Sequence, residues 1–191
     1  MMPQNSIEDQ EKKELHIRKL EPGDKPRIAE MVASTGNFNE VEIKTALELV
    51  DEASAEGEKS GYYIVVLEAG TKSPVVKGYA CYGPAPLTQG VYDLYWIVVD
   101  PVSQGKGFGQ RLLKYVERDI VKRGGRMLLI ETSSQETYGA TTRFYERSGY
   151  ELVASIKNFY RIGDDKLVFS KDLPGGCDSN LPPVGSELRP P

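Results

Sequence analysis

The sequence is poor in the residues that several kinds of site require. It has one histidine, His16, and two cysteines, Cys81 and Cys177, in 191 residues. Two distant cysteines support neither a disulfide framework nor a zinc cluster, and we expect no metal site. A Ser/His/Asp or Cys/His nucleophilic centre would have to use His16, and no nucleophile motif lies beside it.

Long apolar runs and an excess of positive charge are also missing. No stretch approaches the ~20 apolar residues that a membrane-spanning helix needs. Residues 1–14 are polar and charged where a secretory signal would be apolar. We therefore expect a cytoplasmic protein without a membrane partner. The formal net charge of -4 argues against a nucleic-acid partner held by phosphate contacts.

Hydrophobic residues make up 39% of the chain, which is enough for one core at this length. Their spacing predicts a single domain over residues 15–173, between a flexible leader (1–14) and a disordered Pro/Gly/Ser-rich tail (174–191). Periodicity predicts strands at 15–20, 62–68, 75–82, 91–99, 127–132, 151–156 and 166–171, and helices at 24–35, 39–57 and 141–147. A further helix follows the glycine loop and stops at Gly124-Gly125, with its apolar face at positions 112, 113, 116 and 120. This order is α+β and does not alternate as a doubly wound fold does.

A glycine-rich loop joins the strand at 91–99 to a helix. Gln104-Gly105-Lys106-Gly107-Phe108-Gly109 follows Val99-Asp100-Pro101 and leads directly into an amphipathic helix. Glycines let the main chain approach a ligand, and the free N–H groups of a helix N-terminus favour an anion such as pyrophosphate. The Walker pattern lacks its Gly-Lys-Ser/Thr ending, and the dinucleotide fingerprint lacks glycine at Gln110. A surface turn entering a helix is the structural alternative.

This loop resembles the Gln/Arg-x-x-Gly-x-Gly/Ala signature of the GNAT superfamily of N-acetyltransferases. Residues 93–101 are similar to the family's fourth strand, and residues 143–150 to its Leu/Phe-Tyr-x-x-x-Gly-Phe/Tyr segment. The resemblance covers about residues 15–173. It implies an α+β fold with a mixed, mostly antiparallel sheet of about six to seven strands flanked by about four helices. It also implies transfer of an acetyl group from acetyl-CoA to a primary amine of a small molecule or a protein.

The resemblance further implies where acetyl-CoA lies. The loop amides would hold the pyrophosphate, and the preceding strand would pair with the pantetheine arm where the fourth and fifth strands separate. The implied cofactor-binding residues are Ile97, Val98, Val99, Gln104, Gly105, Lys106, Gly107, Phe108, Gly109 and Gln110. Many members carry an asparagine at the position of Tyr138, so the cofactor contacts beyond the loop stay open, with residues 133–135 as substitutes.

Two side chains are implied to be catalytic. Glu131 matches a glutamate that takes the amine proton in some members, and Tyr145 matches a tyrosine that hydrogen-bonds the departing sulfur as general acid. A lysine-like amine with a pKa near ~10.4 is less than ~0.1% neutral at pH 7, so such an acceptor most needs a base. Asp93 is the reserve base, and a backbone N–H near Val99 is implied for the oxyanion. A solvated carboxylate at Glu131 and a packing role for Tyr145 are the alternatives.

The sequence leaves the acceptor, the acyl group and the choice between monomer and homodimer open. Residues 81–87 and 158–165 are expected to flank the acceptor, and Asp164 and Asp165 either attract a cation or form a hairpin turn. Cys81 lies in an apolar strand without a neighbouring base, which indicates a buried hydrophobe instead of an acyl carrier. A non-catalytic acyl-CoA-binding module and a transferase of another acyl group are the alternative functions.

Overall fold

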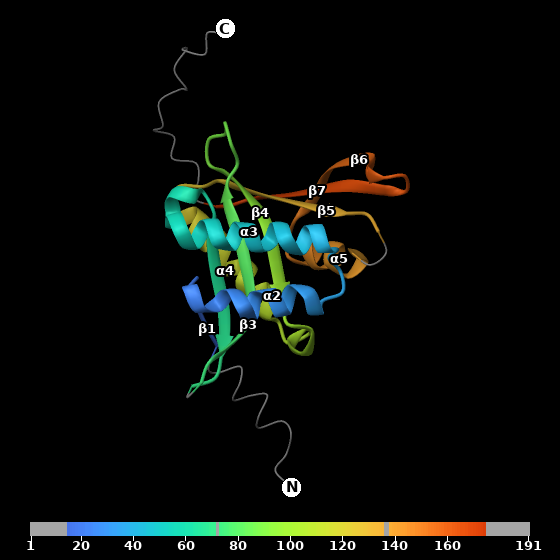
Figure 1. Ribbon diagram of the computed structural model, residues 1–191. Helices are drawn as coiled ribbons and strands as arrows, with labels where there is room; N and C mark the ends of the chain where they lie inside the picture. The colour runs from blue at the N-terminus through green and yellow to red at the C-terminus, as the bar shows by residue number, and fades with distance from the viewer. Residues whose placement is uncertain (1–14, 72, 136–137, 175–191) are drawn as a thin grey trace.

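A computed structural model describes residues 15–71, 73–135 and 138–174. In this part of the chain seven strands form one sheet in the order β1-β2-β3-β4-β5-β7-β6. The strands are β1 (Leu15–Lys19), β2 (Tyr63–Ala69), β3 (Val75–Pro84), β4 (Val91–Val99), β5 (Met127–Ser133), β6 (Glu151–Arg161) and β7 (Asp164–Asp172), and the α-helices are α2 (Lys25–Ser34), α3 (Glu40–Glu56), α4 (Phe108–Lys122) and α5 (Gly139–Arg147) (Figure 1). Neighbouring strands are antiparallel except β4 and β5, which are parallel.

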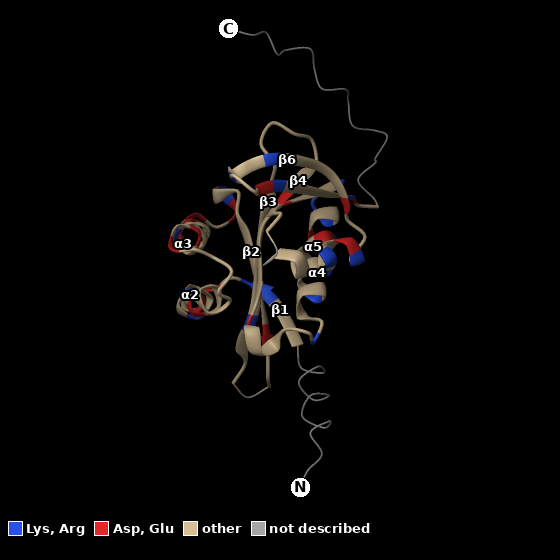
Figure 2. Ribbon diagram, turned by 90° about the vertical axis from the view of Figure 1, so that its right-hand side faces the viewer, with Lys and Arg blue, Asp and Glu red and all other residues tan. Residues whose placement is uncertain are grey.

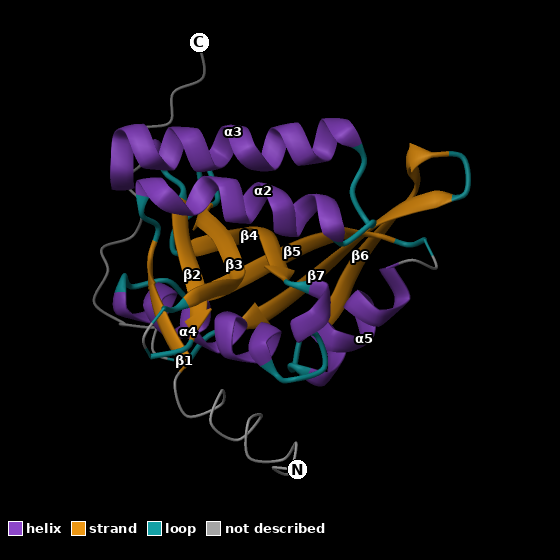
Figure 3. Ribbon diagram, turned by 60° about the horizontal axis from the view of Figure 1, so that its bottom comes forward, coloured by secondary structure: helices purple, strands orange, loops and turns teal. Residues whose placement is uncertain are grey.

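The molecule has three layers. Helices α2 and α3 cover one face of the sheet, and α4 and α5 cover the other, as Figures 2 and 3 show. Each face has its own buried cluster: Ile28, Met31 and Val32 of α2 belong to one, and Leu112, Leu113 and Val116 of α4 to the other. None of the described helices is long and apolar enough to cross a bilayer.

The predicted α+β order is confirmed, and the bounds of several elements differ. The hairpin of β6 and β7 is longer than expected, because strand structure continues to Arg161 and resumes at Asp164. Helix α5 starts at Gly139, two residues before the expected start. The expectations for residues 1–14 and 175–191 lie outside the described residues.

Individual residues explain where helix α3 begins and how closely helix α4 approaches the sheet. Helix α3 begins at a capping box, in which the Glu42 N–H donates to Asn39 Oδ1 (2.9 Å) and the Asn39 N–H donates to Glu42 Oε2 (2.8 Å). Helix α4 lies close to the sheet over Gly78 of β3. A Cβ at Gly78 would stand 2.8 Å from the Val98 carbonyl oxygen and 3.0 Å from Leu112 Cδ1, so only glycine fits there.

A β-bulge in β4 sets the direction of its side chains. Cys81 of β3 is opposite Trp96, but the next residue, Tyr82, is opposite Leu94, so Tyr95 is the extra residue. As a result Leu94 and Ile97 both face the α4 cluster, whereas Trp96 faces the α2 cluster. The bulge lies where the pairing of β4 with β5 ends.

Candidate active site

Strands β4 and β5 separate at the middle of the sheet. They pair from Val91↔Met127 to Leu94↔Ile130 and no further, although both strands continue. From Glu131 onward β5 pairs only with β7. The backbone of β4 from Tyr95 to Val99 is therefore without a strand on its β5 side, and we call this opening the β4–β5 gap.

The N–H groups of Ile97 and Val99 point into this gap. Asp100 donates its N–H to the Lys77 carbonyl of β3 at 2.9 Å. Because successive N–H groups of a strand point to opposite sides, the Val98 N–H faces β3 and those of Ile97 and Val99 face away from it. The Val99 carbonyl accepts a hydrogen bond from Gln104 Nε2 at 3.4 Å, which ties the end of β4 to the start of the glycine loop.

The glycine loop exposes mainly main-chain atoms at Gly105 and Gly107. Gly105 and Gly107 have φ values of 76° and 84°, and nothing lies within 4 Å of a Cβ built at either position. Gly107 is the N-cap of α4, whose first N–H groups have no acceptor inside the helix. The loop thus has the shape and the partial positive charge that a pyrophosphate needs, and side chains larger than hydrogen would fill that space.

Helix α5 brings Tyr145 to the same region. A Cβ built at Gly109, in the first turn of α4, would lie 3.5 Å from the Phe144 ring and 3.7 Å from Val99 Cγ2, so the loop, β4 and α5 meet there. The ring of Tyr145 is buried against Tyr150 and Phe169. Within the described residues its hydroxyl has no hydrogen-bond partner. Burial raises the pKa of Tyr145, so the phenol keeps its proton at neutral pH.

Glu131 lies on the other face of the sheet. Its neighbours Ile130 and Thr132 are buried on the α4 and α5 side, and alternation along β5 turns Glu131 the opposite way. Glu131 forms an ion pair with Lys166 Nζ at 2.5 Å. Asp93 of β4 shares this face because the bulge at Tyr95 inverts the alternation. Burial, and after it the charge of Glu131, raises the pKa of Asp93.

Different functional groups thus border the gap on the two faces of the sheet. The α4 and α5 face holds the glycine loop and Tyr145, and the opposite face holds Asp93, Glu131 and Lys166. We call the latter side the acceptor face. Two pairs of aromatic rings also lie on this side of the sheet, in edge contacts between Phe38 and Trp96 and between Tyr62 and Tyr95.

The structure also shows the contacts of Tyr138, for which the sequence comparison expected an asparagine, and of the residues before it. The Tyr138 hydroxyl donates to the Asn37 carbonyl at 2.9 Å and so links the start of α5 to the loop between α2 and α3. The side chains of Ser133 and Gln135 donate to Asp164 at 2.5 and 2.9 Å. These groups bind the β6–β7 hairpin to β5, and the buried Asp164 is part of that hairpin's structure.

Lys166 is the residue of this face that sequence reasoning missed. It lies 35 positions after Glu131 in the chain, and the two meet only because β7 pairs with β5 out of chain order. No motif around Lys166 indicated this contact. Cys81, in contrast, is buried as predicted, and burial raises the pKa of its thiol to about 12.

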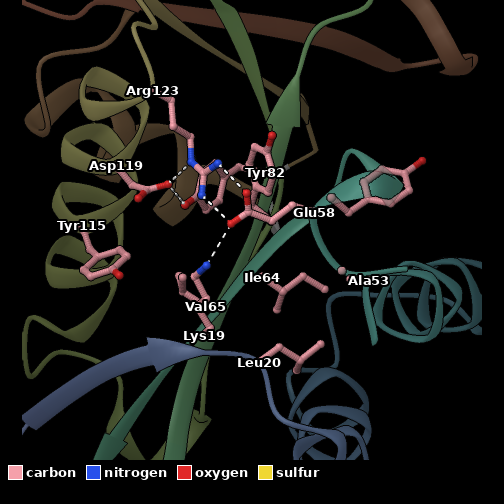
Figure 4. A pocket seen from close by; sticks show the side chains of 13 residues that line it. Lys19, Leu20, Ala53, Glu58, Ile64, Val65, Tyr82, Tyr115, Asp119 and Arg123 are labelled. Atoms are coloured by element: carbon pink, nitrogen blue, oxygen red, sulfur yellow. Dashed lines mark hydrogen bonds and ion pairs between the residues drawn. The ribbon is translucent and has the colours of Figure 1, made fainter. Parts of the chain in front are cut away.

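A separate cavity of about 110 Å³ lies between α4, the start of β2 and the 3-10 helix η2 (Gly57–Ser60) (Figure 4). Glu58 accepts hydrogen bonds there from Arg123 of α4 and Lys19 of β1. Arg123 also donates to Asp119 at 2.6 Å and lies 4.0 Å from the centre of the Tyr63 ring. The charges of this cavity are paired with each other, so its evident role is to fix η2 to α4. Among the described residues no group of His, Cys, Asp and Glu is arranged to hold a metal ion.

Comparison with known proteins agrees with this geometry. A family model of the acetyltransferase (GNAT) domain matches residues 59–152. The curated S-(2-succino)cysteine N-acetyltransferase of Bacillus subtilis (strain 168) is 29% identical over 69 residues, which are 36% of this chain. The match spans 42% of that relative's length.

Two solved structures share the fold over most of their length. A putative acetyltransferase of the GNAT family from Desulfovibrio desulfuricans is 43% identical, with a TM-score of 0.79, over 83% of this chain and 99% of that one. A putative acetyltransferase from Salmonella typhimurium, solved with its cofactor acetyl-CoA, is 20% identical with a TM-score of 0.65, over 83% of this chain and 94% of that one. The second likeness shows the fold alone. The 43% identity over nearly the whole of the first protein, together with the matching domain model, shows that this chain belongs to the GNAT family of acetyltransferases.

Proposed function

We propose that this protein is an acetyl-CoA-dependent N-acetyltransferase that passes the acetyl group directly to a primary amine in a ternary complex. The observation that carries this proposal is the β4–β5 gap, which has an anion-binding loop and a buried tyrosine on one face and two carboxylates on the other. Two substrates that enter from opposite faces would meet in the gap. A direct transfer needs this arrangement, because the amine has to reach the thioester while acetyl-CoA is still bound.

The main chain would bind and orient acetyl-CoA, the co-substrate that supplies the activated acetyl group. The N–H groups from Gly105 to Gln110 would hold the pyrophosphate, and the backbone of residues 97–99 would pair with the pantetheine arm. The side chain of Gln104 keeps the end of β4 next to the loop. The Val99 N–H would donate to the thioester oxygen, whose negative charge grows during attack.

The side chains would move the protons. Glu131 and Asp93, which lie beside each other on the acceptor face, would take the proton that the ammonium loses before or during attack. Tyr145 would give a hydrogen bond to the departing sulfur, because the raised pKa of its phenol makes complete proton transfer to a thiolate unfavourable. Cys81 takes no part, because burial keeps its thiol protonated and unreactive.

The experiment is a panel of amines read by release of free CoA thiol. We expect at least one amine to release thiol, with mass spectrometry showing a gain of one acetyl group on the amine. Initial rates at varied concentrations of both substrates should give intersecting lines, as a ternary complex requires. Parallel lines would instead indicate an acyl-enzyme. Acetyl-CoA binding without thiol release for any amine or protein tested would favour a non-catalytic module. Faster thiol release from propionyl-CoA or succinyl-CoA than from acetyl-CoA would indicate that the enzyme transfers another acyl group.

A further inference from the structure

Lys166 is a cation placed among the carboxylates of the acceptor face. Its Nζ is 2.5 Å from Glu131 Oε2 and 4.7 Å from the centre of the Phe159 ring. The Lys166 side chain is 15% exposed, whereas that of Glu131 is 52% exposed. Lysine side chains are normally well solvated, so this ammonium has given up most of its water for one carboxylate and one ring.

Asp93 completes the group from the neighbouring strand. It is opposite Leu129 in the β4–β5 ladder, and Glu131 is two residues further along β5 on the same face. Burial raises the pKa of Asp93, the negative charge of Glu131 raises it further, and Lys166 opposes both effects. Two tyrosines also face these charges: burial and the charge of Asp93 raise the pKa of Tyr95 to about 12, and burial and the charge of Glu131 raise that of Tyr160. Both tyrosines therefore stay neutral at pH 7.

Two neighbouring carboxylates repel each other when both are ionised, and a nearby cation reduces this repulsion. The ion pair with Lys166 holds the Glu131 carboxylate at the edge of the gap. Its charge then acts on Asp93, which is half-buried and has no partner of its own among the described residues. Asp93, whose pKa is raised, is therefore the group that is suited to take up a proton, and it lies next to the point where β4 and β5 separate.

We propose that Lys166 is a positioning residue of this carboxylate pair: it holds the Glu131 carboxylate on the same face as Asp93, and Asp93 takes up one proton from the acceptor amine. The proposal rests on the proposed function, because it needs an amine at this face. It assigns to Lys166 a role that neither the glycine loop nor the tyrosine segment indicates.

The test compares the pH dependence of kcat/KM for the wild-type protein and three variants. In Lys166→Met, Asp93 loses a neighbouring positive charge that lowers its pKa, so its pKa rises and the acidic limb should move up by about one pH unit. Lys166→Arg keeps the charge and should restore the wild-type limb. In Glu131→Gln, Asp93 loses a like charge and keeps Lys166, so its pKa falls and the limb should move down. The amine's own ionisation is the same in all four profiles and cancels in the comparison.

A second measurement needs neither acetyl-CoA nor an amine. Carbon-13 NMR of the carboxyl groups, assigned by Asp93→Asn and Glu131→Gln, follows both groups through a pH titration of the folded protein. The Asp93 carboxyl should titrate higher in Lys166→Met and lower in Glu131→Gln than in the wild type. Unchanged titration of Asp93 in both variants overturns the proposal even if every amine is acetylated normally.

The two proposals can fail separately. If no amine releases thiol from the wild-type protein, the proposed function fails while the NMR titration still reports on the coupling. If the wild type is active and Lys166→Met keeps both its rate and its acidic limb, the role of Lys166 fails while the enzyme assignment stands. Circular dichroism melting of each variant shows that the protein is folded, and if Lys166→Met is not, Lys166→Gln, which also removes the charge and keeps a polar side chain, replaces it in both measurements.

Discussion

Tyr145 combines a buried ring with a hydroxyl that has no hydrogen-bond partner among the described residues. Among the described residues only the Tyr79 hydroxyl is both sealed from solvent and without a partner, so the unpartnered Tyr145 hydroxyl is not sealed and is open to a ligand. Its ring is fixed by Tyr150 and Phe169, and Phe144 beside it touches the first turn of α4. The hydroxyl is thus held in place next to the residues proposed to bind acetyl-CoA.

Tyr145→Phe should lower kcat about 10²-fold and leave the KM for acetyl-CoA nearly unchanged, because the lost hydrogen bond is made mainly to the departing sulfur. Steady-state kinetics with the amine found by the panel measure both constants. Equal activity of the variant would remove Tyr145 from the mechanism.

Tyr79→Phe is the matched control, since it also deletes one hydroxyl from a fully buried tyrosine. Tyr79 of β3 lies in the α2 cluster, and its hydroxyl is sealed from solvent without a partner. We expect unchanged kinetics and a free energy of unfolding higher by about 1 kcal/mol in urea denaturation, because an unsatisfied polar group is removed.

At the scale of elements, the junction from β4 through the glycine loop into α4 is the part of the fold that a ligand would change most. Its main chain turns twice through the left-handed region, at Gly105 and Gly107, and then supplies the N-terminus of α4. The bulge at Tyr95 and the end of β4–β5 pairing leave the preceding backbone open. These three features lie within fifteen residues of each other and together make one surface of main-chain donors.

Gly107→Ala and Gly124→Ala separate backbone strain from ligand contact. Both glycines have similar left-handed backbones, with φ of 84° and 81°, and open space where a Cβ would stand. Each substitution should cost about 1–2 kcal/mol of stability through the same strain. Only Gly107→Ala places a methyl group in the loop, so it alone should raise the Kd for acetyl-CoA, by about tenfold or more in calorimetry. Equal affinities in the two variants would argue against the loop as the binding site.

At the scale of the whole molecule, an ion-pair network holds together elements that are far apart in the chain. Glu58 of η2 accepts hydrogen bonds from Arg123 of α4 and from Lys19 of β1. The hydrogen bonds from Arg123, and after them that from Lys19, lower the pKa of Glu58 from 4.5 to about 2. The network lies at the opposite end of α4 from the glycine loop.

The stabilising effect of Glu58 should therefore depend on pH in a defined window. Because its folded-state pKa is lowered, the contribution is fully present above about pH 4.5 and is lost as the pH falls toward 2. Glu58→Gln should melt below the wild type at pH 7, and the two melting curves should converge toward pH 2. Differential scanning calorimetry from pH 7 to 2 measures this, with Glu52→Gln on the exposed side of α3 as the control. A constant difference in Tm across the range would contradict the assigned ion pair.

The local signals of the chain were sufficient to predict most of the fold. Apolar periodicity located the strands and helices, and the capping residue Asn39 and the glycines after α4 located helix ends, because these effects act over a few residues. The glycine loop and the segment around Tyr145 indicated the family, since their residue types serve main-chain geometry and one hydroxyl. These features are readable without any knowledge of which strands are neighbours.

Only the tertiary structure decided the acceptor face. The bulge at Tyr95, which turns Asp93 toward Glu131, depends on the register between β3 and β4. The contact of Lys166 with Glu131 depends on β7 lying between β5 and β6, out of chain order. Strand order and register are set by the packing of the whole core, so they leave no short-range mark in the sequence. The sequence by itself thus determined the fold class and the family signature, and the three-dimensional pairing of strands determined which charges meet beside the gap.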